Sequence, residues 1–309
     1  MKTDDDGREM TMNKQLLIII LNYNDYSLTD TCVKGLRKNE IKSDVLIVDN
    51  GSENESYKKL CDRYLLDDTV TVIDSGKNGG YSFGNNAGLK YAERKNYKYY
   101  CIMNPDILIK DKKYFDKLTD ILEKSEDIAA ISGLQVYDGK FGRYFLNYWK
   151  LPDKRTGIYN HSFIDYFRKT SPGVLNVKNN IAYADVLSGC CFVIKANVFK
   201  EAGYFDENVF LFYEENILSC TLRKMGYREA VRIDTLFYHN HKKTDYNNYK
   251  SMLKSKKIQI NSRIYFYENY VTKNVYLHFL SKIFSVIDYV ISCLLITLMR
   301  IKKNAEKTF

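Results

Sequence analysis

The stretch that decides the fold is LLIIILNYNDYSLTDTCVKGLRKNEIKSDVLIVDNGS, residues 16–52. It contains two continuous apolar runs, 15–21 and 44–48, separated by a segment at 27–37 whose apolar residues recur at helical spacing. Neither run alternates with polar residues, and both are short, which is typical of strands buried on both faces. The stretch therefore predicts a strand, a helix and a second strand of a parallel sheet.

The same alternation of strands and helices continues outward to about residue 132. Further strands are predicted at 70–73, 99–103 and 128–132, and further helices at 55–65, 82–94 and 111–124. Beyond them, 133–180 predicts a loop-rich excursion over the site, 182–194 more strands and 215–225 a helix. This order indicates an α/β fold in which a mostly parallel sheet has helices on both sides.

Size and composition suggest one large domain with an appendage. The chain has 309 residues, of which 45% are hydrophobic, so it can bury a large core. We interpret residues 1–13 as a flexible, acidic leader without the apolar core of a secretory signal, 14–250 as the main domain and 251–309 as a basic helical tail. Seven cysteines without a C-x-x-C pattern favour reduced thiols in a cytosolic protein.

Positive charge is concentrated in the tail. Residues 251–309 hold ten lysines and arginines against three acidic residues, so they carry +7 of a formal net charge of +9. The basic residues lie beside a long apolar stretch, a combination that favours an anionic membrane surface and argues against a nucleic-acid partner.

The apolar stretch predicts a helix with a narrow polar stripe. Ser281, Ser285, Asp288 and Ser292 step by four, three and four residues and share one helix face. The apolar segment, 283–299, is slightly short for a membrane span of about 20 residues. Three interpretations stay open: the helix lies in the membrane interface, which we favour, packs on the main domain, or forms a homodimer contact.

Polar residues close each of the predicted strands. They are Asn22-Tyr23-Asn24, Asp49-Asn50-Gly51-Ser52, the segment 74–80, and Asn104-Pro105-Asp106. Each alone is ordinary turn chemistry. Ligands of such sheets bind outside the carboxyl ends of the strands, however, so four such segments in register would build one polar rim.

The side chains of this rim suit a phosphorylated ligand. A carboxylate such as Asp106 could hold a divalent cation beside a diphosphate. Asp49 and Ser52 could hydrogen-bond a base or a ribose. The glycine-rich segment 78–86 opens a predicted helix, and its backbone N–H groups could face a phosphate.

Read in order, several segments resemble the family 2 glycosyltransferases of the GT-A fold, especially the bacterial rhamnosyltransferase-like branch. The matching segments are LLIIILNYN, VLIVDNGS, NGGYSFGNNAGLKYA, YYCIMNPDILI, SGCCFVIKANVFKEAGYFDENVFLFYEENILSCTLRKMGY and FYHNHKKT. The resemblance spans about residues 14–250. It implies a GT-A sheet that binds a nucleotide-sugar donor.

The resemblance implies roles for the rim. Asp49 matches the aspartate that contacts the pyrimidine base of the donor. The implied donor-binding residues are Asn22, Asp49, Asn50, Ser52, Asn78, Gly80, Asn86 and Asn104. Asp106 matches the last aspartate of the family's D-x-D motif and is implied to bind Mn²⁺ or Mg²⁺, with Asn104 in place of the first aspartate. His239 matches the histidine that completes the metal site, with His241 as its competitor.

The resemblance also implies an acceptor site and a general base. Ser188 and Gly189 match the segment beneath the acceptor, and Glu215 matches the family's base, which is usually an aspartate. Ile217 stands where the family usually has a further aspartate. Because of these departures, Glu214 stays open as the base.

Together these features predict an inverting glycosyltransferase that moves a sugar from a UDP- or dTDP-sugar to a hydroxyl of a glycan or lipid-linked acceptor. Its setting would be bacterial surface polysaccharide synthesis, in the cytoplasm at the inner face of the membrane. Two alternatives stay open: a non-catalytic nucleotide-sugar-binding or assembly subunit, and a sugar nucleotidyltransferase. The absence of lysine and arginine between Leu21 and Lys34 counts against the second.

Overall fold

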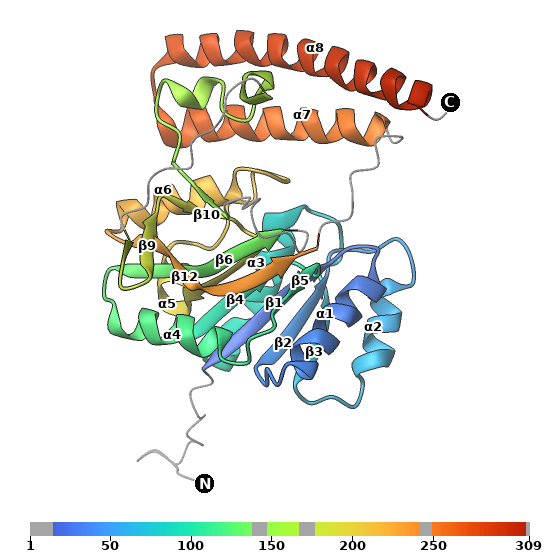
Figure 1. Ribbon diagram of the computed structural model, residues 1–309, viewed down its shortest axis with the longest axis vertical. Helices are drawn as coiled ribbons and strands as arrows, with labels where there is room; N and C mark the ends of the chain where they lie inside the picture. The colour runs from blue at the N-terminus through green and yellow to red at the C-terminus, as the bar shows by residue number, and fades with distance from the viewer. Residues whose placement is uncertain (1–14, 138–146, 167–176, 241–248, 307–309) are drawn as a thin grey trace.

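The computed structural model describes residues 15–137, 147–166, 177–240 and 249–306. Its described part contains one large mixed sheet with helices on both faces, and two long C-terminal helices form a further layer above it (Figure 1). The predicted leader, 1–13, and His241 lie outside the described residues.

The large sheet has the strand order β3-β2-β1-β4-β11-β6-β12-β9-β8, with the short β5 paired to β12. The strands are β1 Leu16–Asn22, β2 Asp44–Asp49, β3 Val70–Asp74, β4 Tyr99–Met103, β5 Ile107–Leu108, β6 Ile128–Tyr137, β7 Tyr148–Trp149, β8 Val177–Lys178, β9 Ile181–Ala184, β10 Val186–Leu187, β11 Cys191–Lys195 and β12 Arg228–His239. Strands β3, β2, β1 and β4 run parallel, as do β6 and β12, whereas β11 runs antiparallel between β4 and β6. β7 and β10 form a separate ladder.

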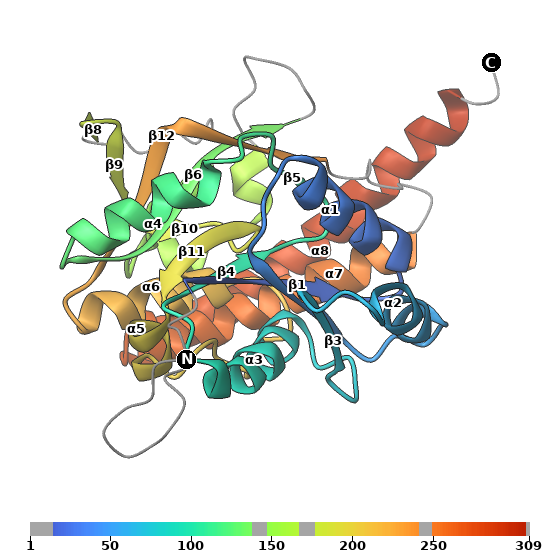
Figure 2. The same cartoon turned by 90° about the horizontal axis from the view of Figure 1, so that it is seen from below.

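Helices cover both faces of the sheet. They are α1 Tyr26–Lys38, α2 Ser56–Tyr64, α3 Tyr81–Ala92, α4 Tyr114–Lys124, α5 Ala196–Glu201, α6 Glu214–Lys224, α7 Tyr249–Phe266 and α8 Val275–Glu306. Alternate residues of β1 belong to two hydrophobic cores, one on each face of the sheet. Ile18 and Ile20 pack against α1, α2 and α4, whereas Leu17 and Ile19 pack against α3, α5 and α6. Figure 2 shows α1 and α3 on opposite sides of β1. Burial on both faces explains why these strands are apolar without alternation.

The predicted fold class, α/β with a mostly parallel central sheet and helices on both faces, is confirmed. β12 is the longest of the strands that sequence reasoning missed; the others, β5, β7 and β8, have two residues each. Its apolar residues are interrupted by Arg228, Glu229, Arg232 and Asp234, and its register on β6 shifts between Arg232 and Leu236. A bulged strand of this kind has no continuous apolar run and no regular alternation to identify it.

The polar stripe of α8 faces the protein. Ser281, Ser285, Asp288 and Ser292 are all buried. Asp288 lies 3.0 Å from Arg263 and 3.2 Å from Lys256, both of α7. The tail is therefore tied to the rest of the chain through its polar side, and several of its apolar residues, such as Val286 and Leu294, face outward.

Candidate active site

The tips of β1 and β2 carry a hydrogen-bonded cluster of predicted donor-binding residues. Asp49 is buried, and its carboxylate accepts hydrogen bonds from Asn22 Nδ2 at 2.6 Å, Ser52 Oγ at 2.8 Å and Ser52 N at 2.7 Å. Thr29 Oγ1 donates to Asn22 Oδ1 at 2.8 Å and orients the asparagine. Parallel register places Asn22 beside Asp49. The structure thus brings Asn22, Asp49 and Ser52 together.

The glycine-rich loop before α3 docks on this cluster. Asn50 Nδ2 donates to Asn78 Oδ1 at 3.2 Å and to the carbonyl of Gly80 at 3.0 Å. Gly51 and Gly80 have φ of +65° and +93°. A Cβ on Gly51 would overlap the backbone of Lys77. Both positions therefore need glycine for the positive φ and for space, because a Cβ on Gly80 would likewise overlap the carbonyl of Phe210.

Asn86 lies apart from the other predicted donor-binding residues. Its Nδ2 donates to the carbonyl of Phe205 at 2.8 Å, and its Oδ1 accepts from the N–H of Phe205 at 3.1 Å. Nδ2 also contacts Glu207 Oε1 at 2.9 Å. The side chain is buried and both ends of its amide are used to hold the segment that leads into α6.

Asp106 and His239 converge although 133 residues separate them. Pairing of β5 with the end of β12 puts His239 opposite Ile107, next to Asp106. Asp106 Oδ1 and His239 Nε2 are 3.1 Å apart, and the two side chains are 14% and 6% exposed. No three His, Cys, Asp or Glu residues of the described ranges form a group that could hold a metal ion. A bound cation would take its remaining ligands from the donor or water.

Gln135 of β6 contacts His239 and shows in which chemical setting the Asp106–His239 pair lies. Cys190 Sγ and His239 Nδ1 both lie 3.4 Å from Gln135 Oε1. An imidazole nitrogen and a carboxylate oxygen are both ligands that divalent cations take in proteins, so the chemistry of the pair fits a divalent cation. Asn104 lies beside it and donates its backbone N–H to the carbonyl of Cys190 at 2.8 Å.

Glu214 and Glu215 begin α6 after a strained turn. Phe212 and Tyr213 both have left-handed backbones, with φ of +71° and +69°. Burial raises the pKa of Glu215, and its Oε1 accepts a hydrogen bond from Gly189 N at 3.1 Å. Burial also raises the pKa of Glu214 far above its usual range, and the charge of Glu215 adds to this shift.

Gly189 connects the predicted acceptor segment to Glu215. Its N–H contacts Glu215, and its carbonyl accepts a hydrogen bond from Tyr81 Oη at 2.6 Å. A Cβ on Gly189 would lie 2.9 Å from the Tyr81 hydroxyl and 3.2 Å from Glu215 Oε1. Ser188 Oγ accepts from Cys190 N at 3.5 Å. Sequence reasoning missed Tyr81 because the loop was interpreted only through its backbone N–H groups.

Both carboxylate sites lie near the segment 188–190. Burial raises the pKa of the Cys190 thiol, and the negative charges of Glu215 and Asp106 both contribute to this. Both carboxylates are therefore within electrostatic reach of one side chain. Gln135, which joins Cys190 to His239, was also missed. It is the one amide side chain in β6, and that polar residue in an apolar strand was the signal available.

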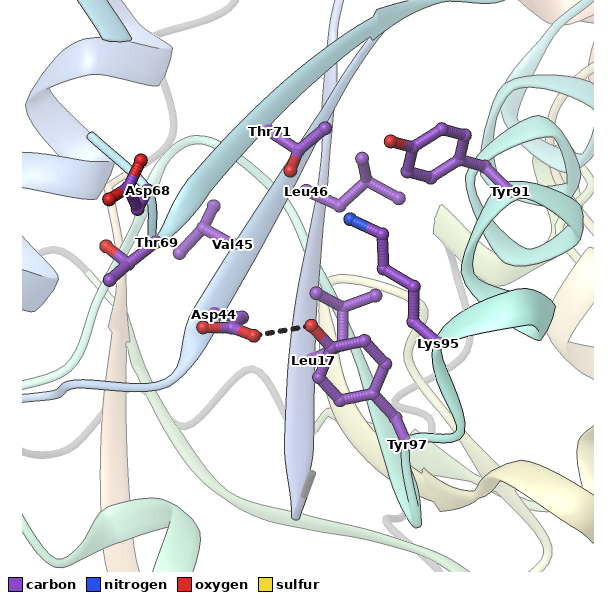
Figure 3. Close-up of a pocket in the computed structure, with 10 residues that line it drawn as sticks. All are labelled: Leu17, Asp44, Val45, Leu46, Asp68, Thr69, Thr71, Tyr91, Lys95 and Tyr97. Carbon is purple, nitrogen blue, oxygen red and sulfur yellow. Dashed lines mark hydrogen bonds between the residues drawn. The ribbon is translucent and has the colours of Figure 1, made fainter. Parts of the chain in front are cut away.

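A small hollow lies at the opposite edge of the sheet (Figure 3). It is lined by residues at the amino ends of β1 and β2, among them Leu17 and Asp44, and Tyr97 Oη donates to Asp44 Oδ2 at 2.5 Å. Its volume of about 30 Å³ is the space of roughly one water molecule. This hollow is too small for a sugar nucleotide.

A sheet of this topology with a polar rim at its strand tips is the GT-A fold. Residues 17–202 match the model of glycosyl transferase family 2, and the chain belongs to this family.

The proteins similar to the chain include two curated relatives and two solved structures. A low-salt glycan biosynthesis hexosyltransferase, Agl10 of Haloferax volcanii, is 28% identical over 67% of this chain and 61% of its own length. Glycosyltransferase GlyG of Streptococcus pneumoniae is 24% identical over 43% of this chain and 44% of its own length. The chain thus spans less than two thirds of either relative.

The solved structures show the fold. A mannosyltransferase from Pyrobaculum calidifontis, in complex with GDP-Man and Mn²⁺, gives a TM-score of 0.56 at 13% identity over 82% of this chain and 64% of its own. S. aureus TarS 1-349 in complex with UDP-GlcNAc gives 0.52 at 14% identity over 85% of this chain and 69% of its own.

Proposed function

We propose that this protein is an inverting glycosyltransferase that transfers a sugar from a nucleotide-diphosphate sugar to an acceptor hydroxyl, with Glu215 as general base. Membership of family 2 supports glycosyl transfer. The observation that carries the proposal is the position of Glu215: its carboxylate accepts a hydrogen bond from Gly189 N, and both it and Asp106, which lies against His239, are within electrostatic reach of Cys190.

The reaction is a single displacement at the anomeric carbon. Glu215 takes the proton of the acceptor hydroxyl, whose oxygen forms the new bond to the anomeric carbon while the bond to the diphosphate oxygen breaks. Attack from the face opposite the leaving group inverts the centre. This geometry needs a base and a leaving-group site on opposite sides of the sugar.

Glu215 suits the role of base better than Glu214. One oxygen of Glu215 is held by Gly189 N, and the side chain is only partly buried, so the other oxygen can meet an acceptor. Glu214 is 4% exposed, and its Oε2 has no hydrogen-bond partner among the described residues. Burial raises the pKa of Glu214 well above its usual range and so favours the neutral acid, which is the form that cannot accept a proton.

Asp106 and His239 would hold Mn²⁺ or Mg²⁺. A bound cation would neutralise the charge that develops on the leaving diphosphate. The Mn²⁺ in the Pyrobaculum mannosyltransferase complex supports a divalent cation. We further propose a UDP- or dTDP-sugar as donor, which the UDP-GlcNAc complex of TarS supports, and a role in surface polysaccharide synthesis.

The tail supports a site of action at an anionic membrane. In a soluble protein, a helix usually turns its apolar side inward. α8 does the reverse: Val286, Val290, Leu294 and Leu298 are 52–65% exposed, whereas Asp288 is fully buried. The segment Val275–Ile301 is also long and apolar enough to cross a membrane, judged by length and composition. We propose that this apolar face lies in the cytoplasmic membrane interface, where a lipid-linked acceptor would be met.

The test of the enzyme proposal compares two neighbouring variants. A thermal-shift screen of UDP-glucose, UDP-galactose, UDP-N-acetylglucosamine and dTDP-rhamnose with Mn²⁺ selects the donor. Release of nucleoside diphosphate from that donor is then measured. Glu215→Gln should lose at least about a hundredfold in rate with donor affinity within about threefold, as expected for a general base. Wild-type turnover by Glu215→Gln excludes Glu215 as the general base. If only Glu214→Gln loses turnover, Glu214 is the general base instead.

The same assay tests the non-catalytic alternative. A subunit that only binds nucleotide sugars would be stabilised by the donor but would release no diphosphate with Mn²⁺ or Mg²⁺. The sugar nucleotidyltransferase alternative has no support from the family match, which covers residues 17–202.

A further inference from the structure

The turn before α6 has a strained backbone that contacts from other segments must hold in place. Phe212 and Tyr213 are consecutive non-glycine residues in the left-handed region, and Glu214 and Glu215 follow directly. Such conformations persist only where surrounding contacts enforce them, and they cluster at functional sites. The contacts that enforce this turn therefore determine where Glu215 points.

Tyr213 makes the central contact. Its hydroxyl lies 3.0 Å from both the carbonyl oxygen and the side-chain oxygen of Asn160. Its ring packs on Phe266 of α7, with centroids 5.4 Å apart. The side chain is buried, so the turn cannot rotate without breaking these contacts.

Helix α7 supports the same turn from above. Ser262 Oγ donates to the carbonyl of Leu211 at 2.8 Å. Arg263 Nη1 donates to the carbonyl of Asn160 at 3.2 Å, the same oxygen that Tyr213 uses. Arg263 is fully buried and paired with Asp288 of α8. The α7–α8 layer seen above the sheet in Figure 1 therefore braces the turn.

We propose that Tyr213 is a positioning residue for the reaction: its hydroxyl, anchored on Asn160 beneath Arg263, holds the left-handed turn that aims Glu215 at the acceptor. The inference rests on the proposed function, because it assigns Glu215 as base. It adds that the C-terminal helices, through Arg263 and Ser262, belong to the support of the catalytic turn.

The test is Tyr213→Phe, which keeps the ring and removes the hydroxyl. The matched control is Tyr267→Phe, since the Tyr267 hydroxyl also donates to a backbone carbonyl, that of Lys154, at 2.6 Å, but does not touch the turn. With the selected donor and Mn²⁺, Tyr213→Phe should lose about tenfold in kcat, in line with the loss of one buried hydrogen bond, with KM for the donor within about twofold. The control should keep kcat.

A pH profile separates positioning from general destabilisation. The groups that face Glu215 are Glu214 on α6, Tyr81 on α3, Cys190 and Glu229. Burial raises the pKa of Glu215, and activity needs the ionised form, so the rate rises with pH through that pKa. A loosened turn admits water, and the acid limb of Tyr213→Phe should move to lower pH. In Tyr267→Phe it should stay in place.

The outcomes distinguish the two proposals. Wild-type kcat and pH profile in Tyr213→Phe, together with an inactive Glu215→Gln, overturn the positioning role and leave the enzyme proposal standing. An active Glu215→Gln overturns the base assignment. Hydrogen exchange of residues 211–217 gives a readout without turnover: exchange should rise in Tyr213→Phe and in Ser262→Ala. Exchange at the wild-type rate in both variants overturns the proposal that Tyr213 and α7 hold this turn. If Tyr213→Phe does not fold, the exchange measured in Ser262→Ala decides the proposal.

Discussion

At the scale of single residues, neighbouring carboxyl groups differ because their surroundings differ. Glu215 has a backbone N–H partner and partial exposure, whereas Glu214 is buried and one of its oxygens has no hydrogen-bond partner in the described part of the chain. Local sequence alone does not separate two consecutive glutamates, since either can face the site. Packing separates them, because burial without a partner favours the neutral acid.

Asp106 gives a prediction about metal use. Asp106→Asn removes the negative charge next to His239 while keeping the shape of the side chain. We expect the Mn²⁺ concentration for half-maximal donor hydrolysis to rise about tenfold or more, as for the loss of a charged ligand. The control is Asp120→Asn on α4, an exposed aspartate. Equal metal dependence in wild type and Asp106→Asn would remove Asp106 from the metal site.

Glu229 gives a prediction about stability. Burial raises its pKa to about 8, although Ser219 hydrogen-bonds to its carboxyl. Its folded pKa is above its unfolded value, so its contribution to stability is present at low pH and is lost as pH rises from about 4.5 to about 8. Glu229→Gln should therefore lose less stability than wild type between pH 5 and pH 9, measured by urea unfolding. Parallel pH curves for the two proteins would contradict this.

At the scale of elements, the glycine-rich loop before α3 is held against the turn before α6. Tyr81 N donates to the carbonyl of Phe210 at 2.9 Å, and a Cβ on Gly80 would overlap that carbonyl. The glycine-rich loop and the turn before α6 are therefore packed directly together. A substitution in either segment should therefore alter the conformation of the other.

Two glycines of this loop provide a matched pair of substitutions. Gly80 and Gly76 have similar φ, +93° and +83°, but a Cβ on Gly76 meets nothing within 4 Å. A positive φ costs an alanine roughly 1–3 kcal/mol, and the ψ of Gly80, −175°, places this residue in a region that is essentially restricted to glycine. Gly80→Ala should lose more stability than Gly76→Ala in urea unfolding, and donor binding in the thermal-shift assay as well. Equal losses in the two variants would show that space at Gly80 is not limiting.

Element prediction from sequence was accurate where the pattern is local. Strand β4 lies at 99–103 as predicted, and β1 and β2 begin or end within one residue of the predicted runs, because continuous apolar stretches mark strands buried on both faces. The helix predicted at 111–124 begins instead at Tyr114, since Asp111 accepts a hydrogen bond from Lys113 N in a turn. β12 was missed because its stabilising contacts lie on neighbouring strands.

At the scale of the whole molecule, the C-terminal layer combines two roles. Its inner side carries Arg263, which binds Asn160 and Asp288, and its outer side presents the exposed apolar residues of α8. Deleting α8 would remove Asp288 and leave Arg263 without that partner. Point substitutions on the outer side are therefore the sharper test of membrane binding.

The apolar face predicts binding to anionic vesicles. Val290→Glu and Leu294→Glu, each at an exposed position, should together weaken binding to phosphatidylglycerol vesicles at least tenfold, since each loses roughly 1.5–3 kcal/mol of apolar burial. The control is Leu65→Glu with Leu66→Glu, two exposed leucines after α2. Sedimentation with vesicles measures binding. A lipid-free dimer that these α8 substitutions dissociate would instead assign the face to a second copy.

The sequence by itself determined the order of strands and helices and the polar character of the strand tips. Both follow from local patterns: apolar runs specify buried strands, and asparagine and glycine specify the turns that close them. The candidate residues of the rim could be named on that basis, with their roles supplied by the family resemblance.

Only the tertiary structure decided which of those residues meet. Asp106 and His239 are brought together by the pairing of β5 with β12, Tyr81 reaches Gly189 across the sheet edge, and the polar stripe of α8 turns inward onto Arg263. These contacts join residues far apart in the chain. They depend on strand register and helix packing across long connections, which no local sequence pattern encodes.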